Sequence, residues 1–382
     1  MLANDLTARW AAACDDSASF ALSGAGVWPL LALLAAGADG PGRAELEKAA
    51  GVDAREAAEA ARSTQAVLRG SSAVRAALGL WTHRDLPLEP VWLASLPRGT
   101  HGELTGDRAP LDAWAAEQTG GLIRRMPVEV DEDTRLVLAG ALTIRTEWHR
   151  PFHDTNDSAC SGPWSGRDFA ALVRDTRITE RVRVAETPHG PLTLLRVMGT
   201  GGIDVYVLLG TPETRAGDVL TTGIDALAGR HPIRAVHDGA PGVLVERVRS
   251  YKPEDRLRVC VPRFSIRSEH DLMETPELFG LATVSDMSRG HFPGISSSPL
   301  AVQQAAQDVV ATFQARGFEA AVITLVGVAA GGAGGWSPPP PYRVTHVEFT
   351  VDRPFGFLTL DRRSGLALTA GWVAEPEDAA WD

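Results

Sequence analysis

The stretch GFEAAVITLVGVAAGGAGGWSPPPP (residues 317–341) begins as a strand and continues as a loop. Six side chains of its first half alternate at a period of two: Phe318, Ala320, Val322, Thr324, Val326 and Val328. This alternation and the β-branched residues are typical of a strand with one buried face. Four glycines and four prolines follow, and these residues favour a loop over regular sheet pairing. The sequence therefore predicts a strand of core quality directly before a long loop.

The charge of the chain limits its partners. The 382 residues carry a formal net charge of -11, and the acidic residues are spread along the sequence. Nucleic acids and anionic membranes are bound through basic patches, so we expect neither as a partner. The length and the apolar fraction suffice for a large core.

Cysteine and histidine positions argue against disulfides and metals. Cys14, Cys160 and Cys260 are far apart and odd in number, so no disulfide framework is implied. His149 and His153 have the spacing of helical metal ligands, but the proline between them disfavours a helix. We expect no metal and no cofactor.

The N-terminal segment MLANDLTARWAAACDDSASF carries acidic residues where a signal peptide has a basic and then an apolar run. The apolar run VWPLLALLAAGA (27–38) is too short to span a bilayer and predicts a buried helix. These features favour a cytoplasmic protein, with export by another route left open.

Helical signals gather early in the chain and strand signals late. Helices are predicted over 1–16, 26–37, 42–51 and 109–121. A strand is expected towards the end of 134–148, a hairpin over 192–210, and an alternating stretch that passes into a helix over 256–272. Two further strands are predicted over 342–361 and 365–376. This order indicates an α+β chain built on large antiparallel sheets.

Catalytic motifs are absent from the sequence. It contains no G-x-S-x-G, no H-E-x-x-H, no Walker loop and no G-x-G-x-x-G. The glycines at 331–335 do not lead into a helix N-terminus, so a flexible loop is a better interpretation than a phosphate cradle. We therefore do not expect an enzyme.

Five segments, in order, carry a resemblance to a known family: FALSGAGVWPLLALLAAGADGPGRAELEKAAG (20–51), LDAWAAEQTGGLIRRM (111–126), TRLVLAGALTIRTEWHRPF (134–152), VCVPRF (259–264) and VEFTVDRPFGFLTLDRRSGLALTAGWVAEP (347–376). The second matches an N-x-W-x-x-x-x-T-x-G-x-I pattern at Trp114, Thr119, Gly121 and Ile123. Together the segments resemble those of serpins, along nearly the whole chain.

The resemblance implies a single serpin-like domain over 1–382, a monomer, with an exposed reactive-centre-type loop over about 318–341. In serpins a protease cleaves this loop, which then inserts as a new strand into a central sheet and traps the protease. The family spacing puts the bait bond near Gly331, within Ala330, Gly331 and Gly332. No Lys or Arg lies in 318–337, so the implied target is an elastase- or subtilisin-like protease.

The chain departs from the family pattern at the loop hinge and at the sheet opening. The hinge corresponds to Gly317, Phe318, Glu319, Ala320, Ala321 and Val322, with Phe318 where the family has Thr or Ser. The bulk of Phe318 either raises the barrier to insertion or indicates a loop that is already partly inserted.

The sheet-opening region corresponds to Ser23, Gly140, Trp148 and Gln307, with glycine and glutamine replacing the family's Asn and His, and Gly26 replacing a Ser. A conventional hydrogen-bonded latch is therefore not expected. Two functions stay open: a loop-inserting protease inhibitor, and a non-inhibitory serpin-fold binding or carrier protein.

Overall fold

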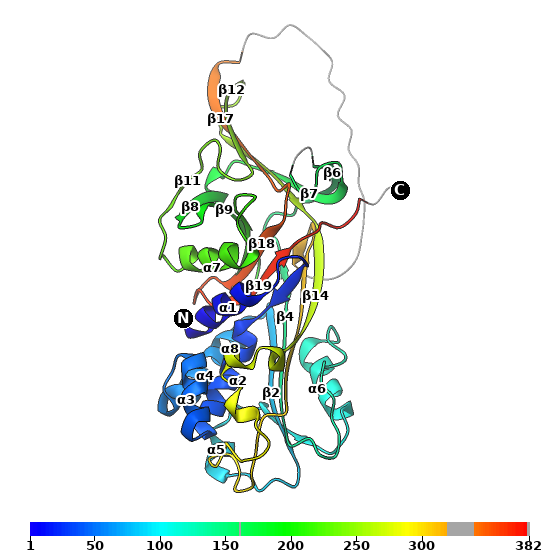
Figure 1. Cartoon of the computed structure of the whole chain (residues 1–382). Coiled ribbons are helices and arrows are strands. Elements are labelled where there is room, and N and C mark those ends of the chain that lie inside the picture. The colour runs from blue at the N-terminus through cyan, green and yellow to red at the C-terminus, as the bar shows by residue number, and fades with distance from the viewer. Residues whose placement is uncertain (160–161, 319–339, 380–382) are drawn as a thin grey trace.

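A computed structural model describes residues 1–159, 162–318 and 340–379 of the chain (Figure 1). The helices are α1 (Leu2–Ala13), α2 (Gly24–Gly37), α3 (Gly40–Ala50), α4 (Ala54–Gly70), α5 (Pro90–Ser95), α6 (Ala109–Thr119), α7 (Ala216–Leu227) and α8 (Pro276–Phe279). The four helices predicted from sequence are confirmed to within three residues at each end. Gly51 and Gly120 end α3 and α6 with φ of 68° and 66°, a left-handed conformation that suits glycine.

The sheet that positions the site, called the long sheet here, joins distant parts of the chain. Its strands are β3 (His101–Leu104), β2 (Val74–His83), β4 (Leu136–Ile144), β15 (Gln304–Phe313), β14 (Phe264–Asp271), β16 (Gly317–Phe318) and β5 (Thr146–Glu147). Along one edge, β15 pairs with β4 over its first part and with β16 at its last residue, Phe313. Along the other edge, β15 pairs with β14.

Two further sheets complete the described fold. The C-terminal sheet has the order β1 (Phe20–Leu22), β19 (Ala367–Val373), β18 (Phe355–Asp361), β10 (Ile203–Leu209), β9 (Gly190–Met198), β8 (Val182–Thr187) and β11 (Ile233–Ala235). The five-stranded sheet has the order β12 (Val243–Ser250), β17 (Tyr342–Thr350), β13 (Arg256–Pro262), β7 (Asp168–Thr176) and β6 (His153–Ser158). Among these pairings only β2–β3, β4–β15 and β13–β17 are parallel, so the predicted mostly antiparallel α+β fold is confirmed.

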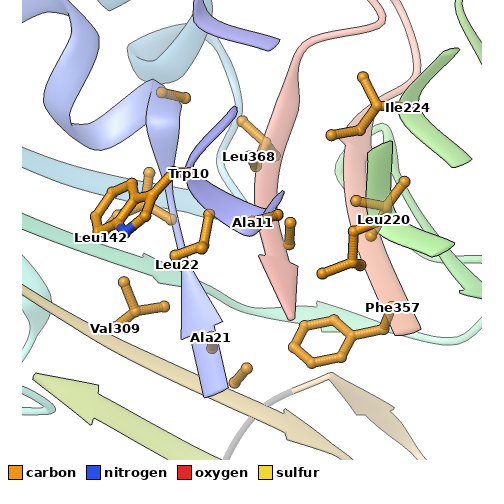
Figure 2. Packing of buried hydrophobic residues seen from close by; sticks show 14 of the residues in the cluster. Trp10, Ala11, Ala21, Leu22, Leu142, Leu220, Ile224, Val309, Phe357 and Leu368 are labelled. Atoms are coloured by element: carbon orange, nitrogen blue, oxygen red, sulfur yellow. The ribbon is translucent and has the colours of Figure 1, made fainter. Parts of the chain in front are cut away.

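Helices cover both faces of the long sheet (Figure 1). α6 packs on one face of β2 and β4, where Trp114 meets Trp81 edge to face at 5.6 Å. α2 and α4 pack on the other face, while β12 and β17 extend at the opposite end of the molecule from α2–α5. The core runs through the middle: Figure 2 shows Leu22, Leu142 and Val309 from three strands gathered together, with Phe357 of the C-terminal sheet further along.

The prediction of one strand over 342–361 is wrong. The chain forms β17 and then β18, which belong to different sheets. The break falls at residues 351–354, where Pro354 has no N–H to continue a ladder. The Val351 N–H donates to the Cys260 carbonyl, 3.0 Å, and the chain then leaves the five-stranded sheet.

Candidate functional site

The centre of the long sheet contains a parallel junction between β4 and β15, called the seam here. It comprises six Cα pairs, from Gln304 opposite Val137 to Val309 opposite Leu142. Gly140 and Gln307, both predicted from sequence for the sheet-opening region, lie directly opposite each other in it. Because Gly140 has no side chain, these two residues meet across the seam through backbone alone.

Gln307 instead bonds to the start of α2. Its Oε1 accepts from the Ser23 N–H at 2.8 Å, and its Nε2 donates to the Ser23 carbonyl at 2.8 Å. The Ser23 hydroxyl caps α2 by accepting from the Gly26 N–H at 3.0 Å, and it donates to the Leu368 carbonyl at 2.5 Å. Gln307 and Ser23 are both fully buried. A hydrogen-bonded cluster is thus present, but it ties β15 to α2 rather than to β4.

The two glycines of this cluster provide the space that the glutamine occupies. A Cβ atom at Gly26 would lie 2.9 Å from Gln307 Nε2, and one at Gly140 would lie 2.9 Å from the Gly26 carbonyl oxygen. Both distances are too short for a side chain in this packing. Glycine at residues 26 and 140 and glutamine at residue 307 therefore fit together sterically, because each glycine leaves space that this packing needs.

An ion pair on β14 and β15 was missed by the sequence reasoning. Asp308 is fully buried, and its Oδ2 lies 2.6 Å from Arg267 Nη2 on the neighbouring strand. Burial raises the pKa of Asp308 above its usual range, and the Arg267 bonds oppose that rise. An acid inside the apolar run that forms β15 was the available signal, but its partner depends on the β14–β15 register.

Trp148, the other residue predicted for this region, fastens the segment after β5 to the end of β15. Its N–H donates to the Arg316 carbonyl at 2.9 Å, and its indole Nε1 donates to the Gln314 carbonyl at 2.8 Å. The Phe152 N–H donates to the Ala315 carbonyl at 2.7 Å. Three consecutive carbonyls of the turn after β15 are thereby held by residues 148–152.

The hinge residues Gly317 and Phe318 form β16, inside the long sheet. Phe318 pairs with Phe313 of β15 on one side and with Thr146 of β5 on the other. Its side chain is fully buried, and its ring centroid is 6.2 Å from that of Phe357. At Gly317 a Cβ atom would lie 2.3 Å from the Thr146 carbonyl oxygen, so only glycine fits there.

Other predicted residues lie outside the described part of the chain: Glu319, Ala320, Ala321 and Val322 of the hinge, and Ala330, Gly331 and Gly332 at the bait bond. Within the described residues, no three His, Cys, Asp or Glu side chains are grouped so that they could hold a metal. Over the same residues, no helix has the length and apolar character needed to cross a membrane.

Comparison with known proteins agrees with this geometry. The family model for Serpin (serine protease inhibitor) matches residues 2–161 and 240–376. "Putative serpin-Z6C" of Oryza sativa subsp. japonica is 26% identical over an alignment of 422 positions, which covers 99% of this chain and 95% of the relative. Human plasminogen activator inhibitor 2 is 23% identical over 275 residues, covering 70% of this chain and 60% of the relative.

A solved structure has the same fold. The native state of tengpin, a thermophilic serpin, superposes with a TM-score of 0.75 at 15% identity, covering 98% of this chain and 93% of tengpin. The sheet arrangement matches that of a solved serpin, and the serpin family model matches most of the sequence. The chain belongs to the serpin family.

Proposed function

We propose that this serpin inhibits serine or cysteine proteases, and that it does so when its loop over residues 318–341 is cleaved near Gly331 and inserts into the long sheet. The position of β16 carries the proposal. The first two residues of the segment that would insert, Gly317 and Phe318, already pair as a strand between β15 and β5. Insertion would continue a strand that has begun.

The register of β16 defines what insertion requires. If the antiparallel register of Phe318 with Phe313 continues, Val322 comes to lie opposite Val309. The seam occupies that place, so β4 and β15 must separate. One parallel pairing is then replaced by two antiparallel ones, which are slightly more stable per residue. The apolar face that follows Phe318, from Ala320 to Val328, becomes buried as well, so the inserted form is the more stable one.

The Gln307 cluster supports a division of the sheet into a fixed and a moving part. Gln307 fastens β15 to the start of α2, whereas Gly140 gives β4 no side-chain bond across the seam. We infer that β15 stays in place and that β4 moves away with β2 and β3. The native form persists because its rearrangement is slow, as in other kinetically trapped proteins.

The composition of the loop supports a target class. Residues 318–337 contain no Lys or Arg, and the proposed bait region is Ala330, Gly331 and Gly332. Small residues suit the shallow specificity pocket of an elastase- or subtilisin-like protease, while trypsin-like proteases require a basic residue. We place this activity in a cytoplasmic monomer.

The test is denaturing electrophoresis after incubation with an elastase- or subtilisin-like protease. We expect a band at the summed mass that survives SDS. Val322→Asp should be cleaved without forming it, because the charge would have to enter the core. Ala321→Asp, on the opposite face of the same segment, should keep it.

Cleavage of the wild type without a stable band would contradict inhibition. It would instead favour the second hypothesis, a serpin-fold binding or carrier protein. A band formed equally well by Val322→Asp would contradict the insertion step.

A further inference from the structure

A small pocket beside the Trp148 segment contains an excess of positive charge. The pocket has a volume of about 60 Å³ and lies between the residues after β5, the end of β7 and β9. It is lined by His149, Arg150, Arg174, Thr176, Ile178, Arg181 and Met198. No carboxylate is among these residues.

Arg174 is the buried member of this set. It is 8% exposed, its Nη1 donates to the Arg150 carbonyl at 2.8 Å, and its guanidinium carbon lies 4.1 Å from the centre of the Phe152 ring. Its Nε is buried and has no hydrogen-bond partner among the described residues. A buried cation with an unused donor is strongly destabilising unless an anion is nearby.

The surrounding charges do not neutralise Arg174. Arg181 and Arg150 are its near neighbours, and within the described ranges none of the three arginines lies within 4 Å of a carboxylate. The nearby carboxylate of Asp204 already bonds Arg196 at 2.5 Å and Arg362 at 2.6 Å. Burial and the two adjacent guanidinium groups lower the pKa of Arg174 to about 10, so it stays charged at neutral pH.

We propose that the pocket formed by Arg150, Arg174 and Arg181 binds a small oxyanion of the phosphate or sulfate type. Arg150 is exposed at the mouth, Arg181 is half-buried, and Arg174 closes the base. Guanidinium groups donate in pairs to tetrahedral oxyanions, and the bound charge would offset their mutual repulsion. The Thr176 hydroxyl, which is within 3.4 Å of Arg150 Nη1, adds a polar group to the lining.

Anion binding should also affect the fold, because the segment that contributes His149 and Arg150 to the pocket continues to Phe152, which is bonded to the turn after β15. The Arg150 carbonyl is bonded to Arg174, and two residues later the Phe152 N–H is bonded to Ala315. An oxyanion would hold residues 149–152 more firmly and stabilise the native form. This proposal stands whether or not the protein inhibits a protease.

Calorimetric titration of the full chain with sodium phosphate tests the proposal, at neutral pH and with ionic strength held constant by chloride. We expect one saturable site per chain. Arg174→Met keeps the stem but removes the charge, and it should weaken binding at least about tenfold. Arg177→Met is the matched control. Arg177 lies between the pocket residues Thr176 and Ile178 but does not line the pocket, and it pairs with Glu254 at 2.8 Å. This variant should bind as the wild type does.

Thermal unfolding gives a second readout. Phosphate should raise the midpoint of the wild type and of Arg177→Met by more than that of Arg174→Met. If Arg174→Met fails to fold, Arg181→Gln takes its place, because Arg181 is only half-buried. Absence of saturable binding to the wild type would overturn the proposal. So would equal responses to phosphate in the wild type and in the pocket variant that folds, because excluded salts stabilise every variant alike.

Discussion

Gln307 takes the place of a cross-sheet latch by bonding to the backbone of Ser23. Its amide supplies one acceptor and one donor to the same residue, at 2.8 Å each, in a site without exposure to solvent. This arrangement requires glycine at residue 26, where a Cβ atom would lie 2.9 Å from Gln307 Nε2. At the scale of single residues, the cluster therefore depends on the Gln307 amide and on the absence of a side chain at Gly26.

Removal of that amide should destabilise the native protein. Gln307→Ala leaves the buried Ser23 N–H without a partner and opens a small cavity, so we expect a loss of about 2–4 kcal/mol in the free energy of unfolding. Gln304→Ala is the control, since Gln304 is on the same strand but only half-buried, and it should cost less than about 1 kcal/mol. Urea unfolding measures both, and equal losses would contradict the role given to Gln307.

A double-mutant cycle with Gly26 sharpens this prediction. Alanine for glycine inside a helix commonly stabilises by about 0.5–1 kcal/mol, but Gly26→Ala should destabilise here because it displaces the Gln307 amide. In the Gln307→Ala background that penalty should largely disappear, giving a coupling energy of about 0.5–3 kcal/mol. Additive effects would mean that Gly26 and Gln307 are independent.

The buried position of Phe318 favours one of the two interpretations that the sequence left open. From sequence its bulk was either an obstacle to insertion or a sign of a partly inserted hinge. The side chain is already enclosed in the sheet beside Phe313 and Phe357, so it does not have to cross a barrier after cleavage. We infer that the obstacle to insertion is the seam between β4 and β15, which must open before the residues after Phe318 can enter.

At the scale of elements, the sequence predicted four of the eight helices in the described residues, α1, α2, α3 and α6, because their signals are local. The caps of α2, α3 and α6 and the alternation in 256–272 all depend on near neighbours in the chain. The pairing of Arg267 with Asp308 was not predictable, because it depends on a register between strands about 40 residues apart. The three-arginine pocket was missed for the same reason.

The contact between β14 and β1 should make stability depend on pH through His270. Its Nε2 bonds to the Ala21 carbonyl at 2.8 Å, and burial lowers its pKa below the usual 6.5, while Asp308 and Glu274 oppose that shift. The unfolded chain therefore takes up a proton more readily than the native one. Stability is fully present above about pH 6.5 and falls as the pH drops towards the lowered pKa of the native state.

Thermal midpoints at pH 7.5 and pH 5.5 measure this dependence. His270→Gln cannot be protonated and keeps an amide donor near Ala21, so its midpoint should fall less than that of the wild type over this interval. His101, whose pKa is also lowered by burial, should account for part of the remaining fall. The exposed His237 supplies the control, His237→Gln, which should follow the wild type. An identical fall in His270→Gln would refute the assignment.

At the scale of the whole molecule, the native fold contains two competing arrangements of one sheet. In the form described here, β4 and β15 pair directly over six positions, and β16 occupies only the far end of the space between β15 and β5. The competing arrangement extends β16 beyond Phe318 to Val328 as a full strand. Because the added strand buries an apolar face and completes two ladders, cleavage should produce a large gain in stability.

The thermal midpoint of the protein before and after a single cut near Gly331 tests this claim most directly. We predict that the cut wild type unfolds at a much higher temperature than the intact protein. The cut Ala321→Asp variant should show the same rise, and the cut Val322→Asp variant should not. Equal midpoints for the intact and cut wild type would contradict loop insertion and the inhibitory mechanism built on it.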